Sequence, residues 1–267
     1  SITSFFHDVA YLSKKLHIKF HGEQFLGVKI ENTYETLLTI FALWNLDICP
    51  VMLSTNLSEK ELSQLKNQVP FYKVISNIPK INKNQDKDIN FNFLNIKSDA
   101  IVIFTSGTSS IPKGVLLTFE NIIQSALSTI SFFNFKQNNK WILSLPMNHI
   151  AGLMIPMRAL LGGGSVQVEN SDILEWSKIN KNSFCSLVPT QLTRALVGHE
   201  EKIINNLKCL KLILIGGSKI PLELLSLARE YQLNLSPSYG MSEACSTIAA
   251  IPPKDFLLGN DYAATIL

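Results

Sequence analysis

Short apolar runs alternate with amphipathic stretches along most of this 267-residue chain, and this alternation limits the folds that it can adopt. The apolar runs predict strands at residues 25–30, 48–53, 71–75, 100–104, 141–145, 165–168, 184–188, 212–215 and 233–236. Helical spacing predicts helices at residues 5–16, 34–44, 58–67, 118–133, 152–161, 191–197 and 222–231. Because such alternation produces parallel sheets with right-handed crossovers, we expect an α/β fold of mostly parallel sheets flanked by helices.

The composition allows one large core or two smaller ones, since 46% of the residues are hydrophobic and 17% are charged. Residues 77–99 are rich in Lys, Asn and Asp and predict a surface loop, so we expect halves at about 1–99 and 100–267. A net charge of +3 without a dense Lys/Arg stripe argues against a nucleic-acid partner.

Four cysteines stand at positions 49, 185, 209 and 245, without a C-x-x-C pair or a zinc-ligand spacing. This pattern predicts a reducing compartment, and we expect Cys49 and Cys185 to lie in the core. Cys245 has two interpretations, a nucleophile or a small residue lining a pocket. The most apolar stretch, residues 37–53, contains Asn45 and Asp47, which argues against a membrane span and favours the cytoplasm.

A turn rich in hydroxyls and glycine follows the predicted strand at residues 100–104. Backbone amides, hydroxyls and the ammonium of Lys113 are groups that hold polyphosphates. The turn lacks the G-x-x-x-x-G-K-[ST] spacing of the common phosphate loop, and no G-x-G-x-x-G is present. The alternative is a strand followed by an ordinary surface turn.

The turn resembles the signature loop of the adenylate-forming enzymes, T-[ST]-G-[TS]-[TS]-G-x-P-K-G. Residues 105–114 read T-S-G-T-S-S-I-P-K-G, with Ser110 in place of the second glycine. Residues 146–152 resemble the P-x-x-H-x-x-G segment of the same superfamily, and residues 239–243 resemble its Y-G-x-[TS]-E segment. The three segments occur in the order that the superfamily has, and the resemblance extends over nearly the whole chain.

Within the superfamily, four segments resemble the o-succinylbenzoate–CoA ligases of menaquinone synthesis: residues 141–146, 186–192, 215–221 and 239–247. The resemblance implies a ligase that uses ATP, Mg²⁺ and CoA, forms an acyl adenylate, and transfers the acyl group to CoA. It implies that the partners are small molecules, that the protein does not associate with a membrane, and that a homo-oligomer is possible. The alternatives are a ligase or adenylating domain for another aryl or acyl acid, and a truncated, catalytically silent nucleotide-binding protein.

The resemblance also assigns residues to the nucleotide. Lys113 and Glu243 are implied in catalysis, with Glu243 binding Mg²⁺. Tyr239 would stack on adenine. The remaining nucleotide-binding candidates are Thr105, Ser106, Gly107, Thr108, Ser109, Gly216, Gly217, Gly240 and Ser242.

For the acid, the resemblance places His149 beside the reacting carboxylate, where it would orient that group. A second carboxylate requires a cation, and Arg158 matches an arginine position of the ligases, with Lys219 as a weaker candidate. The other interpretation of Arg158 is an exposed helix residue. Hydroxyls for the acid would come from Thr190, Ser246 and Thr247.

The adenylating domain of the superfamily continues beyond the Y-G-x-[TS]-E segment into a small C-terminal domain with a catalytic lysine. We therefore expect this chain to be a partial N-terminal domain, incomplete at both ends and without the lysine-bearing domain. The resulting hypothesis is that the chain alone does not complete turnover.

Overall fold

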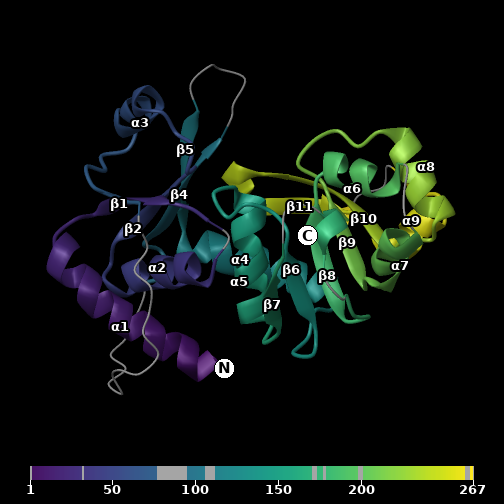
Figure 1. Ribbon diagram of the computed structural model, residues 1–267, viewed down its shortest axis with the longest axis horizontal. Coiled ribbons are helices and arrows are strands. Elements are labelled where there is room, and N and C mark those ends of the chain that lie inside the picture. The colour runs from purple at the N-terminus through teal and green to yellow at the C-terminus, as the bar shows by residue number, and fades with distance from the viewer. Residues whose placement is uncertain are drawn as a thin grey trace. The chain divides into compact units, whose positions relative to one another are not determined.

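The computed structural model describes residues 2–31, 33–76, 95–105, 112–169, 173–176, 179–197, 201–261 and 265–266. The chain forms two compact units, Ser1–Glu120 and Asn121–Leu267, each built on its own sheet (Figure 1). The mostly parallel α/β architecture predicted from the sequence is confirmed. None of the helices in the described part of the chain is both long and apolar enough to cross a membrane.

The first unit contains a five-stranded sheet in the order β3-β1-β2-β4-β5. Its strands are β1 (Phe25–Lys29), β2 (Cys49–Leu53), β3 (Val74–Ile75), β4 (Asp99–Thr105) and β5 (Lys113–Thr118). Strands β1 to β4 are parallel, and β5 runs antiparallel to β4 at the edge. The helices are α1 (Ile2–Phe20), α2 (Tyr34–Asn45) and α3 (Glu59–Lys66), and α1 packs against α2.

Local sequence signals explain where α3 begins and what it covers. Ser58 Oγ accepts from Glu61 N at 3.3 Å, and Glu61 Oε2 accepts from Ser58 N at 2.8 Å, which completes the predicted capping box. Leu65 then packs with Val51 and Val102 of the sheet in one hydrophobic cluster. The cap fixes the start of α3, and Leu65 anchors its last turn in the apolar cluster of the sheet.

The second unit includes most of α4 (Phe119–Phe132) and has a seven-stranded sheet in the order β12-β11-β10-β9-β8-β6-β7. The strands are β6 (Lys140–Leu143), β7 (Ser165–Val168), β8 (Ser183–Leu187), β9 (Leu212–Ile215), β10 (Leu235–Met241), β11 (Ser246–Ala250) and β12 (Thr265–Ile266). Strands β6 to β10 are parallel, and β11 and β12 are antiparallel additions beyond β10.

Helices cover the central strands of this sheet through two different sets of side chains. The longer helices are α5 (Ile150–Leu161), α6 (Pro189–Leu196), α7 (Glu201–Cys209), α8 (Leu222–Glu230) and α9 (Pro253–Leu257), with short 3₁₀ helices η1 (Ile173–Glu175) and η2 (Ser242–Ala244). Helices α6 to α9 share a core with Ile142, Cys185 and Ile213. Trp141 and Phe184, one position before Ile142 and Cys185, lie outside that core with their ring centres 5.4 Å apart. Since alternate strand residues face opposite sides, the sheet buries both faces, as parallel sheets do.

The sequence analysis placed several boundaries differently. It divided the chain near residue 99, whereas β4 pairs with β2 and β5 pairs with β4, so the first unit extends to Glu120. It predicted no strand at residues 113–118, and it ended the last predicted strand at 236, whereas β10 continues through Tyr239 and Gly240 because β11 pairs with them. Helices α7 and α9 were also not predicted.

Candidate functional site

The phosphate-binding candidates of the first unit lie where β4 ends and β5 begins. Thr105 is the last residue of β4 and is paired with Lys113, the first residue of β5; Thr105 Oγ1 donates to Lys113 O at 3.5 Å. Ser106, Gly107, Thr108, Ser109 and the substituted Ser110 lie outside the described residues. Lys113 is exposed and has no ion-pair partner among the residues that the structure describes, so its ammonium is available for an anion.

The backbone on both sides of Lys113 is held by a residue that sequence reasoning missed. Gln68 Nε2 donates to Pro112 O at 2.6 Å, and Gln68 Oε1 accepts from Gly114 N at 3.2 Å. Gln68 lies just after α3, and no sequence motif pointed to it.

In the second unit, the carboxyl ends of β9 and β10 border a pocket of about 910 Å³. The residues around it include Ser218, Lys219, Leu222, Tyr239, Ile251 and Asp261. The carboxyl ends of parallel strands are where ligands bind in open α/β sheets. Tyr239 is 62% exposed, so its ring is accessible to a ligand.

Glycines shape the approach to this pocket. Gly217, just before the lining residue Ser218, has φ +82°, a left-handed conformation that favours glycine. A Cβ at Gly216 would lie 2.7 Å from Ser238 Oγ, and that hydroxyl donates to Ile215 O at 2.9 Å. Glycine is required at position 240 for a steric reason, because a Cβ there would lie 2.0 Å from Ser246 O of β11.

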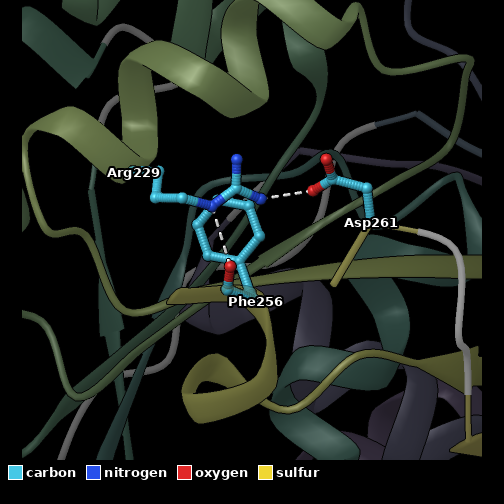
Figure 2. A network of polar contacts seen from close by, with 3 residues as sticks. All are labelled: Arg229, Phe256 and Asp261. Atoms are coloured by element: carbon cyan, nitrogen blue, oxygen red, sulfur yellow. Dashed lines mark hydrogen bonds and ion pairs between the residues drawn. The ribbon is translucent and has the colours of Figure 1, made fainter. Parts of the chain in front are cut away.

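One wall of the pocket is tied to α8 and α9 by Arg229 (Figure 2). Its Nε donates to Phe256 O at 2.9 Å, and its guanidinium lies 4.5 Å from the centre of the Phe256 ring. A second nitrogen donates to Asp261 in an ion pair whose side chains are about one-fifth exposed. Sequence reasoning did not identify Asp261 as a pocket residue.

Arg158 of α5 is buried, with 1% of its surface exposed, so the expectation of an exposed helix residue is wrong. Its guanidinium lies 5.3 Å from the centre of the Trp141 ring, and Nη2 donates at 3.2 Å to both Ser246 Oγ and Thr247 Oγ1. The structure thus brings together three of the acid-binding candidates. Arg158 Nε has no hydrogen-bond acceptor among the described residues.

Arg158 retains its charge at neutral pH. Burial lowers its pKa to about 10, while the nearby Cys245 thiol acts in the opposite direction. Burial raises the pKa of Cys245 to about 11 against the lowering effect of Arg158, so this thiol is neutral and poorly nucleophilic near pH 7. Of the two interpretations of Cys245, the geometry favours a buried residue beside Arg158.

His149, Thr190 and Glu243 are exposed. His149 is the exposed N-cap residue of α5 and uses only backbone atoms in the cap. Thr190 is exposed in the first turn of α6. Glu243 is exposed in η2, next to the partly exposed Ser242, and has no described partner.

The donor set fits Mg²⁺ held largely by phosphate oxygens. In the described part of the chain, no group of three or more His, Cys, Asp or Glu residues forms a metal cage. Mg²⁺ at phosphate sites commonly uses one or two carboxylates and keeps several waters. The free carboxylate of Glu243 is sufficient for such a role, in which the ion would neutralise phosphate charge.

Residues 83–261 match the family described as AMP-binding enzyme, and this match covers about two thirds of the chain. The chain belongs to the AMP-binding enzyme family. Its family relatives include 2-succinylbenzoate–CoA ligases of Staphylococcus epidermidis, 28% identical over 245 residues, and Listeria monocytogenes, 29% identical over 247 residues. These alignments cover 86% and 85% of the chain but 51% and 52% of the relatives, so the chain spans about half their length.

Solved structures of AMP-binding enzymes share the fold. The o-succinylbenzoate CoA synthetase of Bacillus subtilis in complex with the acyl-adenylate intermediate OSB-AMP superimposes with a TM-score of 0.78 at 24% identity, covering 94% of this chain and 70% of that one. The same enzyme in complex with ATP and magnesium ion gives 0.75 at 23% identity, covering 97% and 57%. These likenesses establish the architecture in which the candidate residues lie.

Proposed function

We propose that this chain belongs to an AMP-forming acid–CoA ligase that activates o-succinylbenzoate with ATP and passes the acyl group to CoA. The family match supports adenylate chemistry, and the names of the relatives support this acid. The single observation that carries the choice of acid is the buried guanidinium of Arg158, which has no carboxylate partner among the described residues.

A buried charge without a counter-ion is costly to the fold. The partners of Arg158 are two neutral hydroxyls and an aromatic ring, and Nε remains unsatisfied. A bound carboxylate would satisfy this nitrogen and neutralise the charge, because arginine binds carboxylates through two parallel hydrogen bonds. o-Succinylbenzoate has a second carboxylate besides the one that reacts, so it meets this requirement and benzoate does not.

The other candidate residues would act by positioning ATP and the acid and by neutralising their charges. Attack of a carboxylate on the α-phosphorus of ATP requires two anions to approach, so cations and fixed donors carry the rate. We assign Lys113 to the triphosphate, Ser242 to the α-phosphate, and His149 to the orientation of the reacting carboxylate. Tyr239 and the pocket beside it suit adenine, because stacking requires an exposed ring face.

The test is an acid panel with two arginine variants. Arg158→Met should weaken o-succinylbenzoate binding by about tenfold to a hundredfold, the value of a charge-assisted hydrogen bond, and should leave benzoate binding unchanged. The free energy of unfolding of the same variant should be equal to or higher than that of the wild type, since the substitution removes an uncompensated buried charge. The matched control is Arg194→Met, an exposed arginine of α6, which should change neither quantity. Calorimetry and chemical denaturation measure both.

Pyrophosphate release separates the alternatives, measured with a protein that includes this chain and the further length present in its relatives. Release with o-succinylbenzoate, but not with benzoate or fatty acids, supports the proposal. Equal release with benzoate would indicate a ligase for another aryl acid. ATP binding without any acid-dependent release would indicate a catalytically silent nucleotide-binding protein.

A further inference from the structure

Lys113 stands at the outer edge of the first sheet, where one side of its backbone faces β4 and no strand in the described part of the chain pairs with the other side. In an extended strand, the C=O of residue 112 and the N–H of residue 114 point to the same side. These are the two groups that Gln68 binds. The side-chain amide of Gln68 therefore takes the place of a neighbouring strand at this point.

Gln68 is itself held by the core of the first unit. Its backbone N donates to Leu65 O at 3.0 Å at the end of α3, and Val69 N donates to the same oxygen at 3.2 Å. Leu65 and Val69 are buried in the cluster that also includes Val102 of β4. The backbone of Gln68 is consequently held in place, and its side-chain amide reaches β5 from this fixed position.

Close packing at Gly114 reinforces this arrangement. A Cβ at Gly114 would lie 3.2 Å from Phe104 and 3.2 Å from Val69, the residue after Gln68. The segment after α3 thus lies directly against the start of β5. Lys113, between the two bonded peptide groups, has an anchored backbone and an exposed side chain.

We infer that Gln68 is a positioning residue for Lys113, holding the backbone from which the ammonium reaches the triphosphate. This inference rests on the proposed function, because it assumes that Lys113 binds phosphate. Gln68 does not touch the nucleotide in this role. Its two hydrogen bonds hold the backbone of Lys113 in place, so the lysine side chain loses less conformational entropy when its ammonium binds phosphate.

The first measurement is independent of any ligand. Gln68→Ala removes the acceptor of the Gly114 amide, so that amide should exchange with deuterium about fivefold faster, as loss of one hydrogen bond implies. Gln68→Glu keeps an acceptor for Gly114 N and loses the donor to Pro112 O, so Gly114 exchange should stay near the wild-type rate. Gln64→Ala, in the preceding helix α3, is the matched control and should leave Gly114 exchange unchanged.

The second measurement is the Kd for Mg–ATP of the 267-residue chain in a double-mutant cycle. Lys113→Ala should raise the Kd by about tenfold, and Gln68→Ala should raise it by about threefold in the native background only. In the Lys113→Ala background, Gln68→Ala should have no further effect, since the residue that it positions is gone. A general loss of structure would lower affinity in both backgrounds, and the melting temperature of each variant measures that loss directly.

The outcomes distinguish the inference from the function on which it rests. Unchanged Gly114 exchange in Gln68→Ala, or equal effects of Gln68→Ala in both backgrounds, overturns the positioning role while leaving the phosphate role of Lys113 intact. A Kd that is unaffected by Lys113→Ala overturns the phosphate role, and the positioning role falls with it. Faster exchange together with a background-dependent Kd supports both.

Discussion

At the scale of single residues, Arg158 is a buried cation without a carboxylate partner among the described residues. Arg158 lies on a helix whose described side chains are buried almost all round, from Gly152 to Ala159. The charge is therefore surrounded by apolar packing, by the Trp141 ring and by two hydroxyls. Because such an environment cannot replace water for a cation, the natural complement of this site is an anion.

A glycine next to this site predicts a sharp effect of adding one methyl group. Alanine at Gly240 would place its Cβ 2.0 Å from Ser246 O and 3.0 Å from Thr247 Cα, which are backbone atoms that cannot move alone. Strand β11 would have to shift, carrying with it both hydroxyls that bind Arg158. Gly240→Ala should lower the free energy of unfolding by about 3 kcal/mol, and should weaken o-succinylbenzoate binding.

The control for this variant is Gly22→Ala. Gly22 has φ +83°, with nothing within 4 Å of the added Cβ, so only the left-handed conformation is strained. That strain costs about 1 kcal/mol. Denaturant unfolding measures both variants. Equal losses in the two would contradict a steric role for Gly240, and intact acid binding in a destabilised Gly240→Ala would contradict its coupling to Ser246 and Thr247.

The sequence indicated the identity of Arg158 but not its burial. Helical periodicity alone left an exposed and a buried arginine equally acceptable. The signal that was available is the apolar run around it, since a helix that is apolar on all sides is a buried helix. Gln68 gave no signal, because an exposed glutamine after a helix is common and its partners lie 44 and 46 residues further along the chain.

At the scale of elements, α9 is held to α8 by a charged side chain rather than by apolar packing alone. Arg229 of α8 binds Phe256 O, covers the buried Phe256 ring, and pairs with Asp261 at the pocket wall (Figure 2). The two ionic side chains are mostly buried, so solvent screens them only in part. This arrangement links the position of α9 to one side of the nucleotide-pocket candidate.

Arg229→Ala should therefore loosen α9 and the turn after it. The amides of Leu258, Gly259 and Asn260, which donate to carbonyls within this segment, should exchange faster. Asp261→Asn should have a smaller effect, because the Phe256 contacts remain and a partly exposed ion pair contributes about 1 kcal/mol. Glu230→Gln, the exposed neighbour of Arg229, is the control. Unchanged exchange in Arg229→Ala would show that apolar packing alone holds α9.

The predicted bounds of helices and strands were accurate where the hydrophobic periodicity was strong, and strands were missed where only pairing with another strand defines them. Strands β7 and β9 have the predicted bounds, and α2 and α8 differ by one residue. Strand β5 was missed because Lys113 and Gly114 read as the end of a turn, and only the register with β4 makes them a strand. Strand β11 was missed for the same reason, since β10 supplies its partner.

At the scale of the whole molecule, the candidate residues divide between two units with separate cores. Thr105, Lys113 and Gln68 belong to the first unit, whereas Arg158 and both of its hydroxyl partners belong to the second. The structure places β4 in the five-stranded sheet and β10 in the seven-stranded sheet, which the order of strands along the chain does not reveal.

This division predicts that acid recognition and phosphate recognition are separable. A fragment of residues 121–267 retains the whole hydrophobic cluster under β8 and β9, together with Trp141 and Arg158. It should therefore fold cooperatively and bind o-succinylbenzoate with a Kd within about threefold of that of the 267-residue chain, because the contacts of Arg158 lie within it. Trp141 lies against the guanidinium, so its fluorescence should report this binding. The same fragment carrying Arg158→Met should give no change in fluorescence. A fragment that folds but binds the acid no better than its Arg158→Met form would show that the first unit supplies the acid contacts, and the assignment of Arg158 would then be wrong.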